Sequence, residues 1–124
     1  SAVGDRSAAL AAIRETAAIR RELAERDPAT HAPALAPCLH RLTKRLAEAG
    51  HRGEALETAR EAVAAYRSLA RRRPEDFGRG LAGALRTYAS VLEWAGRKAD
   101  AARIRQESEA ATEQRVLEAS IRGF

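Results

Sequence analysis

With 124 residues, the chain can form one domain with a modest core, and an aromatic content of only 4% argues against sandwiches and large cofactor pockets. The net charge of +5 comes almost entirely from arginine, but acidic residues are interleaved with the basic ones. The chain contains no run of five like charges, which would indicate a nucleic-acid-binding tail. No apolar run reaches membrane-spanning length, and no signal peptide is evident. A single cysteine, Cys38, excludes an internal disulfide and favours a reducing, cytoplasmic location.

Long tracts rich in Ala, Arg, Glu and Leu, separated by clustered prolines, predict an all-α chain without strands. The first tract predicts a helix over residues 6–26. A second helix is expected over 33–49, because proline is tolerated near a helix start and both Pro33 and Pro37 lie there. Its apolar face consists of Leu35, Leu39, Leu42 and Leu46, which are spaced four, three and four residues apart.

Gly50 predicts a left-handed stop to this helix, where a Cβ would be costly. The third helix is then expected over 52–72, with Ala55 in its apolar stripe and Pro74 after its end.

The fourth predicted helix, 80–95, repeats the apolar face of the second with Leu85, Tyr88 and Leu92. Gly96 again marks a stop, and the fifth helix, 97–119, has Ala101 where the third has Ala55. Residues 120–124 are expected to fray.

These elements belong to an internal repeat of 46 residues, the distance from Gly50 to Gly96. The same shift superposes residues from both helices and both loops without a gap, which is typical of solenoids. The matched pairs include Leu10/Leu56, Arg14/Arg60, Glu15/Glu61, Pro28/Pro74, Leu39/Leu85 and Leu46/Leu92. We therefore expect an α-solenoid of antiparallel helical hairpins, about five helices in one domain over residues 1–124. Because the chain has no Met and its first helix has no hairpin partner, we expect it to be part of a longer protein.

The pattern resembles the tetratricopeptide repeat, a helical hairpin with a small residue at the turn, alanine where the helices cross and proline at the end. The motif positions are Leu39, Leu42, Leu46, Gly50, Ala55 and Pro74 in one copy and Leu85, Tyr88, Leu92, Gly96 and Ala101 in the next. The unit exceeds the usual length of about 34 residues. Seven extra residues lengthen the second helix by two turns, and five are expected before the next helix. Long repeats of this kind are similar to those of large actinobacterial proteins, in which signalling ATPase or caspase-like protease domains often accompany them.

The resemblance implies a concave groove lined by the first helix of each hairpin. Carried over by position, the groove-binding candidates are His40, Arg41, Lys44, Arg86, Ser90 and Trp94, with Glu48, Thr87 and Glu93 beside them. This set is net basic and includes one large aromatic, which suits an acidic or C-terminal peptide. The family's carboxylate clamp uses Lys and Asn, and this chain has no Asn, so no clamp is predicted. Trp94 suits two roles equally, a groove anchor or a packing residue between repeats.

No catalytic or metal-binding constellation is found. The histidines, His31, His40 and His51, lack metal-ligand spacing, and Cys38 and His40 are two residues apart, which on a helix face different ways. Cys38 is interpreted as a small, semi-buried apolar residue. We therefore expect no enzyme activity and no cofactor.

The leading hypothesis is a scaffold that binds a protein, a peptide or a neighbouring domain in the basic groove. Nucleic-acid binding through the arginine-rich surface is the first alternative, disfavoured by the scarcity of aromatics and by the interleaved acids. The second alternative is a structural spacer or self-association element, in which exposed solenoid ends would allow a homodimer.

Overall fold

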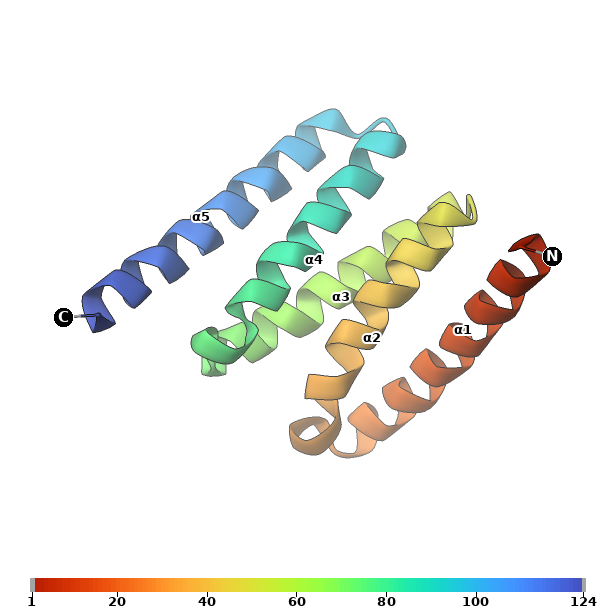
Figure 1. Cartoon of the computed structure of the whole chain (residues 1–124), viewed down its shortest axis with the longest axis horizontal. Coiled ribbons are helices and arrows are strands. Elements are labelled where there is room, and N and C mark those ends of the chain that lie inside the picture. Colours follow the sequence, from red (N-terminus) through yellow and green to blue (C-terminus); the bar gives the residue numbers. More distant parts are fainter. Residues whose placement is uncertain (1, 124) are drawn as a thin grey trace.

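The computed structural model describes the backbone of residues 2–123 and the side chains of residues 4–123, and all of its regular elements are helices. The five helices are α1 (Ala2–Arg26), α2 (Pro28–Glu48), α3 (Arg52–Arg72), α4 (Pro74–Trp94) and α5 (Lys98–Arg122). Each packs against the next in chain order, so successive helices form antiparallel hairpins (Figure 1). The predicted all-α solenoid of five helices is confirmed.

The helices form two layers. Within the described chain, α2 also contacts α4 directly, whereas no backbone contact joins α1 to α3 or α3 to α5. In a curved array, alternate helices lie closer to each other on the inside than on the outside. Therefore α2 and α4, which touch, form the inner layer, and α1, α3 and α5 form the outer layer. The first helix of each hairpin therefore lies on the inner side.

The two glycine turns have the backbone conformation that their sequence predicts. Gly50 and Gly96 have φ of 82° and 80°, in the left-handed region where any other residue would be strained. In each turn the amide N–H after the glycine reaches back across the helix end: His51 donates to the Leu46 carbonyl at 2.9 Å and Arg97 to the Leu92 carbonyl at 2.8 Å. The chain thus reverses in three residues at both places.

The starts of α2 and α4 differ from the prediction. α2 begins at Pro28, five residues before the expected start, and α4 begins at Pro74, six residues early. Proline at the first helical position loses no hydrogen bond and has its φ already set. The residue before each proline, Asp27 or Arg73, is held extended, which makes a one-residue junction between helices. The five repeat residues that we expected before the next helix therefore lie inside it.

Pro33 and Pro37 consequently lie inside α2, and the prediction that they mark its start is wrong. Each lacks an N–H, so the carbonyls of Ala29 and Pro33 lose their usual helical donors. Asp27 offsets part of this cost by capping the helix, because its carboxylate accepts a hydrogen bond from the Thr30 N–H at 3.4 Å. The end of α5 also differs: the helix continues to Arg122, three residues past the expected end.

The core is built mainly from leucine and alanine, with the buried leucines concentrated on the inner helices. Leu39, Leu46 and Leu85 are completely buried, and so are Ala55 and Ala101 at the start of the second helix in each hairpin. Alanine lets two helix backbones approach closely while leucine fills the space beside them. Cys38, expected to be semi-buried, is fully buried in one cluster with Leu39, Leu46 and Ala55.

Paired arginines join the helices of the outer layer. Arg21 of α1 binds Glu61 of α3 through two hydrogen bonds of 2.7 and 2.8 Å. One repeat later, Arg67 of α3 binds Glu107 of α5 in the same bidentate way. A third pair, Arg14 with Glu54 at 2.6 Å, also links α1 to α3. The forked guanidinium matches a carboxylate geometrically, and these pairs bridge helices whose backbones do not touch.

A substitution of Gly80 would test the packing between α3 and α4. A Cβ at this position would lie within 2.9 Å of three ring atoms of the buried Tyr66. We expect Gly80→Ala to destabilise the protein by about 1–3 kcal/mol despite its better helix propensity, because the ring must move within a packed core. Urea unfolding would measure this. The control is Gly53→Ala in α3, where a Cβ meets nothing within 4 Å and should be neutral or stabilising by up to about 1 kcal/mol. Equal effects at both glycines would contradict the packing argument.

The outer-layer ion pairs give a second prediction. In a double-mutant cycle on Arg67→Ala and Glu107→Ala, we expect a coupling energy of about 0.5–1 kcal/mol, because both side chains are more than a third exposed. The same cycle on Arg21 and Glu61 should give a similar value. Both couplings should shrink at high salt. A coupling of zero at low ionic strength would show that the pairs do not hold the layer together.

Candidate functional site

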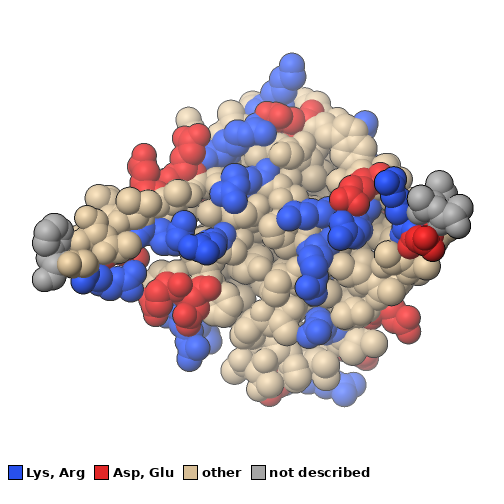
Figure 2. Space-filling view, in the orientation of Figure 1, with Lys and Arg blue, Asp and Glu red and all other residues tan. Residues whose placement is uncertain are grey.

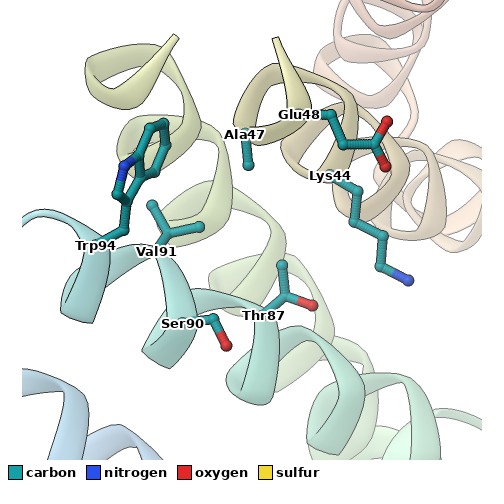
Figure 3. Close-up of a pocket in the computed structure, with 7 residues that line it drawn as sticks. All are labelled: Lys44, Ala47, Glu48, Thr87, Ser90, Val91 and Trp94. Carbon is teal, nitrogen blue, oxygen red and sulfur yellow. The ribbon is translucent and has the colours of Figure 1, made fainter. Parts of the chain in front are cut away.

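A pocket opens on the inner layer, between the C-terminal halves of α2 and α4. Its walls come from both helices, with one cation, one carboxylate, two hydroxyls, two small apolar side chains and an indole (Figure 3). The lining residues are Lys44, Ala47, Glu48, Thr87, Ser90, Val91 and Trp94. The structure thus brings three of the predicted groove candidates together, namely Lys44, Ser90 and Trp94.

Trp94 lies where it contacts a neighbouring helix and also borders the pocket. It lines the pocket and is 39% exposed, as an anchor for a ligand would be. The guanidinium carbon of Arg52, the first residue of α3, lies 4.6 Å from the centre of its ring. This cation–π contact holds the indole against the neighbouring hairpin. The aromatic wall of the pocket is therefore positioned by a helix outside the pocket.

His40 has a structural contact that the sequence did not indicate. Its Nε2 lies 2.7 Å from the Thr87 hydroxyl oxygen, which joins α2 to α4 beside the pocket. Burial, together with the positive charges of Lys44 and Arg86, lowers the pKa of His40 to about 4. At neutral pH the ring is uncharged, so His40 contributes a hydrogen bond rather than a charge to this surface.

The remaining candidates lie around the pocket rather than in it. Arg41 is exposed on α2, and Arg86 lines a second pocket between α4 and α5 together with Arg105, Ser108, Glu109, Thr112 and Glu113. Glu93, placed in the groove by position, forms an ion pair with Arg105 of α5. Two residues of the pocket were missed, Ala47 and Val91. Val91 is 4% exposed and stands where the other repeat has the exposed Arg45. An apolar residue in place of an arginine at this repeat position was a sequence signal that could have identified Val91 as part of the pocket.

Three cations around the pocket have no ion-pair partner in the described chain. Among residues 4–123, no carboxylate forms an ion pair with Arg41, Lys44 or Arg86. The outer helices are mixed: Arg14, Arg21 and Arg67 are paired, whereas Arg6, Arg71 and Lys98 have no ion-pair partner in the described chain. Glu48, the one acid of the pocket, is paired with Arg45 at 3.2 Å. Figure 2 shows Lys and Arg side chains over the middle of the molecule and most acidic side chains towards its margins. The inner surface therefore offers unneutralised positive charge to a ligand.

Among residues 4–123, no group of three or more His, Cys, Asp or Glu side chains could hold a metal ion. None of the described helices is both long and apolar enough to cross a lipid bilayer. Comparison of the chain with protein-family models, with curated proteins and with solved structures gave no match.

The low pKa of His40 predicts how stability depends on pH. An unfolded histidine has a pKa near 6.5, so between pH 6.5 and 4 the unfolded chain binds a proton that the folded chain excludes. We therefore expect the free energy of unfolding to fall as the pH is lowered through this range. His40→Gln, which cannot be charged, should reduce this pH dependence. Urea unfolding at several pH values would measure it.

His51→Gln, which removes an exposed histidine, is the matched control for that experiment. Acidic groups also titrate at the lower end of the range, so the informative quantity is the difference between variant and wild type. The burial of His40 would be contradicted if both variants had the same pH dependence as the wild type.

Proposed function

We propose that this chain is an interaction module of the tetratricopeptide-repeat type, and that its inner layer binds an acidic peptide. The observation that carries the proposal is the set of inner-layer cations without ion-pair partners in the described chain, Arg41, Lys44 and Arg86, around a pocket with an exposed indole. The 46-residue helical hairpins, the left-handed glycine turns and the buried crossing alanines support the family assignment. The fully buried thiol of Cys38 is consistent with the cytoplasmic location that we also propose.

The chemistry of the pocket restricts the kind of peptide that could bind. Lys44 and the nearby arginines would bind carboxylates, and Thr87 and Ser90 can hydrogen-bond to a peptide backbone. The Val91 and Trp94 side chains would receive one apolar side chain of the ligand. We therefore expect an extended segment with at least two acidic groups and an apolar residue between or beside them.

The sole tryptophan of the chain provides a direct assay. We would titrate the protein with a panel of short peptides that carry two carboxylates and one leucine at varied spacings, and follow Trp94 fluorescence. Reversing the three cations together, as Arg41→Glu, Lys44→Glu and Arg86→Glu, should weaken binding at least about tenfold and leave helicity unchanged. A neutral panel of the same length should not bind.

The matched control reverses three exposed cations elsewhere, Arg6, Arg71 and Lys98, which changes the net charge equally. If both triple variants lose binding to the same extent, general charge and not the inner layer is responsible. Binding of a mixed-sequence single-stranded oligonucleotide with a steep salt dependence would favour the nucleic-acid alternative. A protein that binds neither probe would favour the structural spacer.

A further inference from the structure

One face of α1 is apolar and is not covered by any other helix of the described chain. Ile19 and Leu23 are 53% and 38% exposed, and Ala9 and Ala12 are also exposed on this face. Thr16 completes it, so the five residues follow the spacing three, four, three, four along the helix. The opposite side of α1, with Leu10 and Ala17, is the one buried against α2. We call the uncovered surface, Ala9, Ala12, Thr16, Ile19 and Leu23, the outer face of α1.

The internal repeat shows what kind of element this face accepts. Its counterparts 46 residues later are Ala55, Thr58, Ala62, Ala65 and Leu69 of α3. In α3, Ala55 and Ala62 are buried in one cluster with Leu39, Leu42 and Leu46 of α2. The same pattern of small residues followed by larger apolar ones therefore already packs against an antiparallel helix inside this chain.

The other end of the solenoid is built differently. Ala59, Val63 and Tyr66 are buried on α3, and Val63 and Tyr66 share a cluster with residues of α4. Their counterparts on α5 are Arg105, Glu109 and Thr112, which line a polar pocket. Polar residues at these positions give a terminal helix a surface that tolerates water. The outer face of α1 has kept apolar residues at the positions by which α3 packs on α2. On α5 the exposed large apolar side chains, Val116, Leu117 and Ile121, lie instead near the end of the helix.

The outer face is complementary to itself when two α1 helices pair antiparallel about a two-fold axis at Thr16. Residues whose numbers add up to 31 or 32 then lie opposite each other. Ile19 faces Ala12 of the second copy and Leu23 faces Ala9, so each large side chain meets a small one. Asp5, on the same side of the helix, meets Arg26 of the second copy, and symmetry makes this ion pair twice.

We propose that the protein forms a two-fold symmetric dimer through the outer face of α1. The partner is a second copy of this chain, with its α1 in the position that α2 occupies against α3. The orientation is antiparallel, as it is for each pair of consecutive helices in the fold. Such an interface is isologous and closed, so it yields dimers and not filaments. It is independent of the inner-layer pocket, which lies on α2 and α4.

Disulfide cross-linking of the full chain tests the register. The only native thiol, Cys38, is fully buried, so any disulfide between two copies of the chain must come from the introduced cysteine. In the proposed dimer, Thr16→Cys places two thiols at the two-fold axis, and mild oxidation should convert most of the protein to a covalent dimer. Ala18→Cys, which is exposed but lies outside the outer face of α1, is the matched control and should remain largely monomeric. Equal cross-linking of both variants would overturn the proposed interface.

A charge exchange tests the orientation, with sedimentation equilibrium as the measurement. The wild type should dimerise as its concentration is raised. Asp5→Arg alone puts arginine opposite Arg26 at both ends and should raise the dimer Kd by about tenfold. The double variant Asp5→Arg with Arg26→Asp restores both pairs and should recover most of the affinity. A wild type that stays monomeric at high concentration, or a double variant weaker than the single one, would overturn the proposal.

Discussion

The close approach of helix backbones through alanine is the constraint on which the rest of this structure depends. At each hairpin a glycine in the left-handed conformation reverses the chain within three residues, so the second helix must start in contact with the first. Only a small side chain fits there, and Ala55 and Ala101 are both completely buried at that point. Leucines of the inner helices fill the space beside the crossing. A larger residue would separate the hairpin and, with it, the inner helices that form the pocket.

The arginines of this fold differ in whether a carboxylate neutralises them. In the outer layer Arg21 and Arg67 are each held by a carboxylate of the next outer helix, at equivalent positions of the two repeats. These pairs join helices whose backbones do not meet, and they neutralise charge on that side. In the inner layer, within the described chain, Arg41 and Arg86 have no ion-pair partner. A net charge of +5 would say little by itself, because what matters for binding is where positive charge is left unpaired.

The errors in the predicted helix bounds come from local rules that the surrounding structure overrides. Proline inside a helix is costly, and on that ground Pro33 and Pro37 were expected near a helix start. The chain instead begins α2 at Pro28, where the Asp27 cap and the fixed proline φ favour helix formation. Burial of Ala36, Cys38 and Leu39 then stabilises the helix beyond the prolines. At α4, acidic residues Glu75 and Asp76 in the first turn favour the early start.

The sequence by itself determined the repeat, the number of helices, the glycine turns and the apolar faces, because these depend on spacings of three, four and 46 residues along one chain. The resemblance to the tetratricopeptide repeat also implied a shared surface for Lys44, Ser90 and Trp94. The tertiary structure decided which side chains meet. The contact of Arg52 with Trp94, the hydrogen bond of His40 to Thr87 and the pairing of Arg21 with Glu61 each join residues 40 or more positions apart. Such contacts depend on how the helices cross and how far apart they lie, and no periodicity within a single helix encodes that geometry.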